Sequence, residues 1–495
     1  MNSRWFSCLV IISPRPFQKM GSRTLPHIVR LVRFGVMVIA LVISRLGEVS
    51  AQDSSQVFSY QQFYQLVLQQ HPVVKQAQLL PQDAQAELLQ ARGGFDPKLG
   101  VTFDRKAFKG ADYYNRFDAA FKIPLWIGEL KAGYERNDGQ KLLSEESPSL
   151  IYSGLTIPIG QGLLIDARRN TLKQAQLFTK IAQAEQIKLI NKTVYYAAKD
   201  YWEWYFAYRQ YQHFKTGYDL AKQRFEATRR RSQLGELAAI DSVEAKITLQ
   251  DRQVMLQQAE VELTNTRLVL STYLWDDQAR PREIPESYTP AYDRLEKVGE
   301  ETLQRLLEVA KQSHPELLKL DLKLKQLAIE ERFRKEMLKP QVDLNFNWLN
   351  EPKAFQADAL SNAFLTNNHK LGISLSQPLF LRKERGKLSQ VRLKQQDTQY
   401  QRQQTNREVA NAVQTAYNEV KALEKQLVIQ QEANQNQELL LKAEQRKFDI
   451  GESSVFLINS RESKLIDMRV KLESLRAKYE KAIANLVYSA GMSSL

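Results

Sequence analysis

The side chains that most often bind metals or perform catalysis are scarce in this chain, which has five histidines and one cysteine, Cys8, in 495 residues. His71 and His314 are the natural candidates for metal ligands, yet neither has a second histidine, a cysteine or a carboxylate at ligand spacing. Each stands directly before a proline, Pro72 or Pro315, and proline suits the first position of a helix because that N–H has no partner there. We therefore expect both histidines to mark helix starts, and we expect no metal site and no cofactor.

Patterns that support catalysis are equally sparse. No nucleophile paired with a base and no glycine-rich phosphate loop stands out in the sequence. The aromatic side chains within residues 195–218 could form a ligand platform, but their helical spacing favours packing between helices. We therefore expect no catalytic residue and a protein that is not an enzyme.

The elements that position the remaining residues come from an internal duplication. An ungapped offset of 243 residues superimposes Pro97 on Pro340, together with the alternating apolar residues that follow each proline. A second offset of 216 residues superimposes Gly235 on Gly451. Each copy runs helix, strand, strand, very long helix and return helix, so the sequence predicts one duplicated unit of mixed α and β structure.

Strands are indicated where the hydrophobic period changes to two. In the second copy this pattern predicts strands at 342–349 and 369–377. In the first copy it predicts strands between about residues 99 and 160. All 27 residues by which the two offsets differ fall between the matched strands of the first copy, where we expect an extra hairpin at 114–137. Strands with one apolar face and one polar face fit either a soluble protein, in which the apolar face covers a core, or a membrane barrel with a water-filled lumen.

Helices are indicated by long stretches without proline. Two of them could each reach on the order of 100 Å and carry apolar residues at a 3.5-residue period, which is typical of helices packed side by side in a coiled coil. Each is followed by a glycine that can end a helix in the left-handed conformation, so we expect the chain to turn back there. The expected helices are 57–95, 163–231 and 238–275 in the first repeat (52–275), and 301–338, 379–448 and 454–490 in the second repeat (301–495), with a proline-rich linker at 276–300.

Residues 1–51 have the layout of a secretory signal peptide, in which basic residues precede a short apolar stretch and a small-residue site. We expect cleavage between Ala51 and Gln52, with Met20 as a candidate for the true start. A permanent membrane anchor is the disfavoured alternative, because the apolar stretch is short. Cleavage removes Cys8 and about +6 of the net charge of +14, so we expect an exported, cysteine-free chain without a nucleic-acid partner.

The expected strands are too few to close a membrane barrel within one chain. The smallest closed membrane barrels have about eight strands, and open strand edges are not tolerated in lipid. Either the strands lie outside a membrane, or several chains share one barrel. Trp126 and Trp348 fall where aromatic side chains could meet a membrane interface.

These features, in this order over about 430 residues, resemble the TolC family of outer membrane efflux ducts. The motifs that carry the resemblance are Ser232-Gln233-Leu234-Gly235-Glu236-Leu237, Phe448-Asp449-Ile450-Gly451-Glu452, Ser376-Gln377-Pro378-Leu379-Phe380 and Ala482-Ile483-Ala484-Asn485-Leu486-Val487. The resemblance implies a homotrimeric membrane protein with a 12-stranded outer membrane β-barrel, continued by a long periplasmic α-helical barrel. It also implies a periplasmic adaptor protein and an inner membrane transporter as partners, in a Gram-negative bacterium.

The resemblance places a gate at the periplasmic end of the tunnel, where this chain departs from the family. Only Asp241 matches, because the family's tyrosine and arginine are replaced by Phe448 and Ser453, and its acidic pair is uncharged here. A closed state would need other contacts, unless the charged candidates are merely solvated helix residues. The aperture candidates are Asp241, Phe448, Leu457, Ser460, Arg461 and Glu462.

The turns between the long and return helices are the expected contacts for the adaptor, since a partner can reach the exposed ends of hairpins. They are Leu234, Gly235, Glu236, Leu237, Ile450, Gly451, Glu452 and Ser453. A capping role for both glycines explains the same residues, and the two interpretations can hold together.

Together the residues and the resemblance predict an outer membrane exit duct of a tripartite efflux or type I secretion system, which passively conducts substrates delivered by the inner membrane transporter and the adaptor. The alternative is a periplasmic coiled-coil adaptor or scaffold protein, which explains the helices but not the two sets of strands. The sequence does not indicate which substrate is transported or which class of pump delivers it.

Overall fold

The computed structural model describes residues 56–138, 149–292, 298–352 and 368–494. The expected signal peptide at 1–51, with its cleavage site at Ala51 and Gln52, lies outside these residues. The chain divides into two units, Met1–Gln56 and Val57–Leu495, and the second unit contains the long helices and the large sheet.

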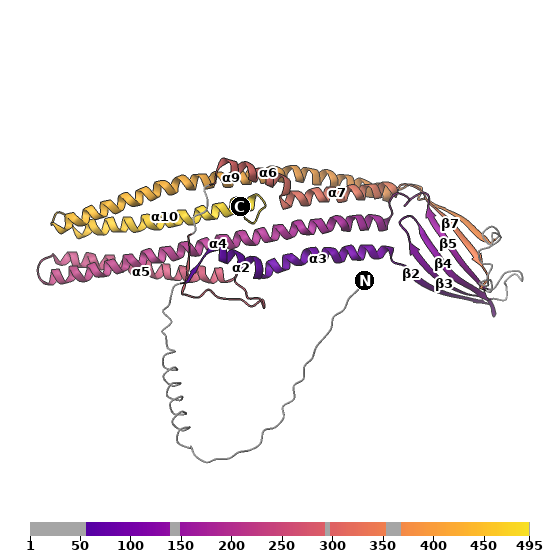
Figure 1. The fold of residues 1–495 in the computed structure, drawn as a ribbon, viewed down its shortest axis with the longest axis horizontal. Coiled ribbons are helices and arrows are strands. Elements are labelled where there is room, and N and C mark those ends of the chain that lie inside the picture. The colour runs from indigo at the N-terminus through magenta and orange to yellow at the C-terminus, as the bar shows by residue number, and fades with distance from the viewer. Residues whose placement is uncertain (1–55, 139–148, 293–297, 353–367, 495) are drawn as a thin grey trace, which may run out of the picture. The chain divides into compact units, whose positions relative to one another are not determined.

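The long helices α4 and α9 of the two repeats run in line with each other, with α7 and α10 packed between them (Figure 1). Helix α4 has 67 residues and α9 has 68, so each is on the order of 100 Å long. Helix α4 packs against α3, α5, α7 and α10, and α9 packs against α7 and α10. The first repeat contains α2 (Tyr60–Gln70), α3 (Pro72–Arg92), α4 (Ala167–Gln233) and α5 (Ala239–Ser271), and the second contains α6 (Glu300–Ser313), α7 (Pro315–Glu336), α9 (Arg382–Asp449) and α10 (Val455–Ser489).

Two of the expected boundaries differ from the structure. Strand β1 (Gln56–Phe58) occupies the start of the segment 57–95 that was expected to be helical, and β6 (Tyr288–Pro290) lies inside the expected linker 276–300. The two strands pair with each other as a small separate sheet. The two strands form because of a contact between distant segments. The ring of Phe58 packs 5.5 Å from that of Tyr288, which lies more than two hundred residues away in the chain.

The two histidines act as helix caps. The Nδ1 atom of His71 accepts a hydrogen bond from the backbone N–H of Val73 at 3.2 Å, and that of His314 accepts one from Glu316 at 3.3 Å. Burial lowers the pKa of both imidazoles, which keeps each ring neutral and its nitrogen able to accept. Within the described ranges, no group of three or more His, Cys, Asp or Glu residues is arranged to hold a metal ion.

The large sheet has six antiparallel strands in the order β2-β3-β4-β5-β7-β8. The extra hairpin expected at 114–137 is β3 and β4, and it is inserted within the sheet rather than beside it (Figure 1). A 12-stranded barrel built from three chains needs four strands from each, whereas this chain supplies six. The strands are β2 (Lys98–Phe108), β3 (Ala111–Pro124), β4 (Glu129–Asp138), β5 (Ser149–Pro158), β7 (Gln341–Asn350) and β8 (His369–Ser376).

The register gives the sheet one apolar and one polar face, since directly opposed residues of neighbouring strands share a face. One row across all six strands reads Leu99, Phe121, Ala132, Ser153, Trp348 and His369, and a second reads Ile123, Leu130, Leu155, Phe346 and Leu371. The adjacent row on the opposite face reads Lys122, Lys131, Gly154, Asn347 and Lys370. No helix in the described part of the chain is both long enough and apolar enough to span a bilayer.

A core of buried aromatic side chains lies where α2 and the small sheet cover the middle of α4. Trp204 on α4 is fully buried, with its ring 6.4 Å from Phe58 and 5.7 Å from Tyr201. The Tyr201 hydroxyl donates to the Phe58 carbonyl at 2.8 Å, so the same cluster also fixes β1. The indole Nε1 of Trp204 is buried without a hydrogen-bond partner in the described structure.

We expect Trp204→Ala to lower the free energy of unfolding by about 3–5 kcal/mol, because it empties a closed aromatic core. Trp204→Phe should cost clearly less, since it retains a ring and removes an N–H that has no partner. Denaturation of the purified variants in detergent, followed by circular dichroism, measures both values. Equal losses for the two variants would contradict this account of the core.

Candidate functional site

Each long helix ends at its tip in the same capping geometry. Gly235 and Gly451 have φ angles of +78° and +82°, the left-handed region that favours glycine. The Glu236 N–H donates to the Arg231 carbonyl at 2.9 Å, and the Glu452 N–H donates to the Lys447 carbonyl at 2.8 Å. These bonds, with the shorter-range bonds from the glycine N–H groups, form the Schellman motif that ends a helix and turns the chain back.

The two tips present matching exposed apolar side chains. Leu234 and Ile450 stand at equivalent positions of the repeats and are 75% and 70% exposed. Ile240 and Phe456 are also equivalent and are 74% and 62% exposed. Large apolar groups that recur at an exposed turn indicate a surface that another molecule covers.

The other expected contact residues of the tips have partners within their own hairpins. Glu236 forms an exposed ion pair with Arg231 at 3.1 Å. The Ser453 hydroxyl donates to Glu444 at 2.6 Å, which ties the second turn to α9. Leu237 is half-buried and Glu452 is exposed.

Two aperture candidates, Phe448 and Arg461, make contacts within the second hairpin. Phe448 packs against a buried cluster between α9 and α10 made by Leu441, Ile458 and Leu465. Arg461 lies 3.6 Å from the Glu444 carboxylate on α9. Phe448 and Arg461 therefore hold the second hairpin together.

Glu462 is buried rather than solvated. Its carboxylate accepts from both terminal nitrogens of Arg224 on α4, at 2.6 and 3.3 Å, and Arg224 also donates to Asn459 at 2.6 Å. This ion pair joins the hairpin of the first repeat to that of the second. Asp241 lies half-buried in the first turn of α5, whereas Leu457 and Ser460 are exposed on α10.

A second polar cluster, around Glu473 of α10, joins the repeats further from the tips. The carboxylate accepts from the Tyr205 hydroxyl at 2.6 Å and from Arg476 at 3.0 Å, and Arg209 lies 3.4 Å away. Burial alone would raise the pKa of Glu473, but the His213 ring 3.9 Å away, the Tyr205 hydrogen bond and the two arginine charges outweigh it and lower the pKa to about 2. Sequence reasoning missed this cluster and Arg224, because their partners are more than two hundred residues apart.

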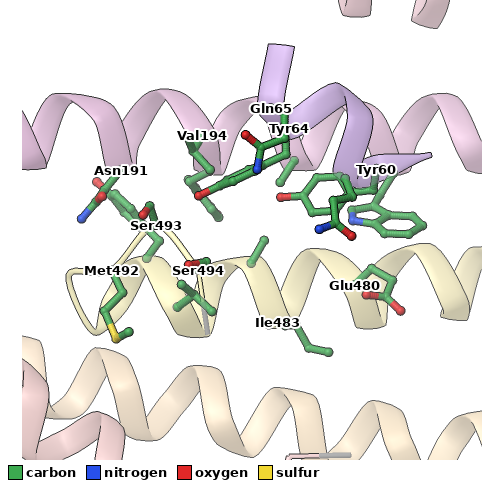
Figure 2. A pocket seen from close by; sticks show the side chains of 17 residues that line it. Tyr60, Tyr64, Gln65, Asn191, Val194, Glu480, Ile483, Met492, Ser493 and Ser494 are labelled. Atoms are coloured by element: carbon green, nitrogen blue, oxygen red, sulfur yellow. The ribbon is translucent and has the colours of Figure 1, made fainter. Parts of the chain in front are cut away.

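A pocket of about 370 Å³ lies where α2, α4 and α10 meet the C-terminal tail. Figure 2 shows Tyr60 and Tyr64 lining it from the side of α2, and Ile483 and Met492 from the side of α10 and the tail. Its lining residues, all within the described ranges, include one carboxylate, Glu480, and no lysine, arginine or histidine. The pocket therefore has the character of an apolar packing gap between the repeats and not of a site with paired acid and base groups.

The polar face of the sheet carries hydrogen bonds between strands. Arg116 on β3 donates to Glu135 on β4 at 2.9 Å, and Thr156 on β5 donates to Asn345 on β7 at 2.7 Å. The Tyr152 hydroxyl reaches across β4 to Asp118 on β3 at 3.3 Å. This reach requires a glycine at 133, since a Cβ there would lie 2.5 Å from the tyrosine ring.

We expect Gly451→Ala to destabilise the second tip by about 1 kcal/mol or more, because alanine is strained at a φ of +82° although nothing occupies the space beside it. Hydrogen exchange of the turn amides should become about fivefold faster. Gly386→Ala is the matched control, since Gly386 lies inside α9 with open space around it and should gain about 1 kcal/mol. Unchanged exchange at the tip of the first variant would rule out the capping role.

We also expect the Glu473 cluster to be acid-labile. A carboxyl whose pKa falls from 4.5 to about 2 on folding stabilises the protein fully above pH 4.5, and this contribution is lost as the pH falls towards 2. The stability difference between the unaltered protein and Glu473→Gln should therefore shrink over that window. Denaturant titrations at several pH values measure it, with the exposed Glu432→Gln as a control. A difference for Glu473→Gln that does not change with pH would refute the lowered pKa.

Residues 306–492 match the family model described as outer membrane efflux protein. This segment covers nearly all of the second repeat, including α7, β7, β8, α9 and α10. No curated protein has a sequence that matches the chain.

Solved outer membrane channels share the fold at low sequence identity. The CmeC channel of Campylobacter jejuni is 14% identical with a TM-score of 0.62, and the match covers 87% of this chain and 85% of that one. VceC of Vibrio cholerae is 15% identical, with a TM-score of 0.59 and coverage of 87% and 96%. MtrE of Neisseria gonorrhoeae is 13% identical, with a TM-score of 0.58 and coverage of 88% and 89%. Residues 306–492 are therefore similar to the outer membrane efflux protein family, and the described chain as a whole shares its fold with solved outer membrane channels.

Proposed function

We propose that this protein is an outer membrane exit duct for efflux, working passively as a homotrimer in a Gram-negative bacterium. The observation that carries the proposal is the six-stranded sheet, whose register puts apolar side chains on one face and polar side chains on the other. In water the apolar face would be exposed, whereas in a bilayer it faces lipid and the polar face lines a wet lumen.

The dimensions of the sheet suit a membrane. Its strands have 8 to 14 residues, and a tilted strand of about 9–11 residues spans a bilayer. Trp126 lies at the end of the sheet next to the helices, and Trp348 lies towards the opposite end of β7. Aromatic side chains at both ends fit the two interfaces of a membrane.

The long helices suit a tunnel that continues the barrel into the periplasm. Each chain supplies two helical hairpins, α4 with α5 and α9 with α10, joined through the Arg224–Glu462 and Glu473 contacts. The exposed apolar pairs Leu234 with Ile240 and Ile450 with Phe456 would contact a periplasmic adaptor, which in turn would recruit an inner membrane transporter. Aperture closure would rest on Asp241, Leu457 and Ser460, the candidates that remain accessible.

A periplasmic adaptor or scaffold is the less favoured function. Such a soluble protein would leave the apolar face of the sheet in water, where Leu99, Val101 and Ile373 are each more than half exposed in the single chain. The matched family and the shared folds are those of outer membrane channels.

We expect the purified protein to form ion-conducting pores in planar bilayers, and we expect the protein in cells to sediment with outer membranes and to resist carbonate extraction. Release into the soluble periplasm would contradict a duct, and so would an inserted oligomer that never conducts.

A matched pair of variants on β2 tests the assignment of the two faces. Val101→Arg places a charge on the lipid face and should cost about 2–4 kcal/mol near the bilayer centre, so less protein should reach the membrane. Thr102→Arg, one residue away on the polar face, should insert normally and change ion selectivity. Equal insertion of both variants would refute the assignment.

A further inference from the structure

We propose that three chains of this protein close an 18-stranded barrel, in which β8 of each chain pairs with β2 of the next, so that the pore is wider than four strands per chain would give. The inference rests on the trimeric duct proposed above. It requires that β3 and β4 belong to the barrel wall. Four separate observations support this requirement.

The first observation is the continuity of the ladder. Strand β3 pairs with β2 along eleven residue pairs and with β4 along ten, and β4 pairs with β5 along eight. Strand β2 therefore reaches the rest of the sheet only through the hairpin. A hairpin that projected from the barrel would leave β2 beside β5 instead.

The second observation is that the apolar face continues through the hairpin. Ala119 and Phe121 of β3 lie opposite Val101 and Leu99 of β2, and Leu130 of β4 lies opposite Leu155 of β5. On the other face lie Asp118 and Lys122 of β3 with Lys131 and Glu135 of β4, whereas Asn115, Arg136 and Asp138 share the apolar face only at the ends of the strands away from the helices. Residues on a lipid-facing wall need this alternation, whereas a hairpin in water does not.

The third observation concerns the turn between β3 and β4, which is docked on the start of α4. The ring of Trp126 stacks on Phe95 with centroids 5.9 Å apart, and the Arg169 guanidinium lies 5.8 Å from the Trp126 ring. Arg168 donates to the Gly128 carbonyl at 3.4 Å. The hairpin thus spans the full height of the sheet and reaches the junction with the helices.

The fourth observation is that polar contacts bind the hairpin to β5 on the lumen face. Tyr152 of β5 crosses over Gly133 of β4 and donates to Asp118 of β3. A bulkier residue at 133 would block this contact, so the three strands fit one another as a unit.

The outer edges of the sheet indicate what completes the barrel. Strands β2 and β8 have no neighbour on their outer side in the described structure, and β2 is exposed along its whole length. Open edges are not tolerated in lipid, so another strand must pair with each. With six alternating strands, β8 of one copy runs antiparallel to β2 of the next, and a second copy of this chain therefore supplies the missing partner.

The strand number sets the pore width. With strands about 4.8 Å apart and tilted by about 40°, 18 strands give a backbone diameter of about 36 Å, against about 24 Å for 12. The cross-section is then about twice as large. The wider exit would admit bulkier cargo than a 12-stranded barrel could pass.

Deleting residues 111–138 tests the strand number, because it removes β3 and β4 and leaves β2 to pair with β5 in the antiparallel sense. We expect single-channel conductance to fall about twofold or more relative to the unaltered trimer. Unchanged conductance in an inserted trimer would overturn the proposal, because the hairpin would then lie outside the wall.

Cysteine pairs give a second measurement that does not require the deletion variant to fold. The described residues contain no cysteine, so one pair of cysteines can be introduced at a time without other thiols in these residues that could react. Thr102→Cys with Ser374→Cys, or with Gly372→Cys, should form disulfides between chains and give covalent trimers by mass. Thr102→Cys with Ile373→Cys, which lie on opposite faces, should not.

Two outcomes of the cross-linking would overturn the proposal. One is a closed covalent dimer, which would make 12 strands from two chains. The other is a disulfide within one chain between Thr102→Cys and Thr156→Cys, since β2 would then lie beside β5. An unaltered protein that never conducts would instead refute the duct itself, so the two failures can be told apart.

Discussion

The structure depends on one constraint: backbone N–H and C=O groups in a hydrocarbon environment must be paired within protein. The five pairs of neighbouring strands in the large sheet meet this constraint, whereas the outer backbone groups of the edge strands β2 and β8 have no partner strand in the described structure. A single chain is therefore incomplete at its edges. Because each sheet is continuous with its own long helices, the proposed trimer that closes the edges would also gather the helices around one axis.

The duplication explains why the helical part is nearly symmetric while the sheet is not. Gly235 and Gly451 end α4 and α9 with the same hydrogen bonds, and the exposed apolar residues beside them recur at the same offset. The 27 additional residues of the first repeat enter as a complete hairpin. An insertion of two strands preserves the alternation of strand directions. An insertion of one strand would have made β8 of one chain parallel to β2 of the next in the proposed barrel.

Local pattern was enough to predict the long helices and the strands of the large sheet, but not their partners, nor the short strands β1 and β6. The period of two identified the strands and the extra hairpin, and the glycine after each long helix identified both turns. The pairing of β1 with β6 and the place of β3 and β4 within the sheet depend on contacts between distant segments, which no local period encodes. For the same reason Glu462 looked like a candidate for the aperture, although Arg224, 238 residues away, pairs with it inside the chain.

A sheet of six strands is wider than a sheet of four, yet it must connect to the same two helical hairpins. The junction between sheet and helices therefore has to accommodate the extra width. The start of α4 carries the contacts that stabilise this junction. Arg169 is buried and donates to the carbonyls of Gly162 and Leu163 and to Asp166, which caps the helix. Its neighbour Arg168 contacts the turn of the inserted hairpin. The residues that begin the long helix therefore also anchor the added strands, which in the proposed duct would couple the width of the barrel to the position of the tunnel wall.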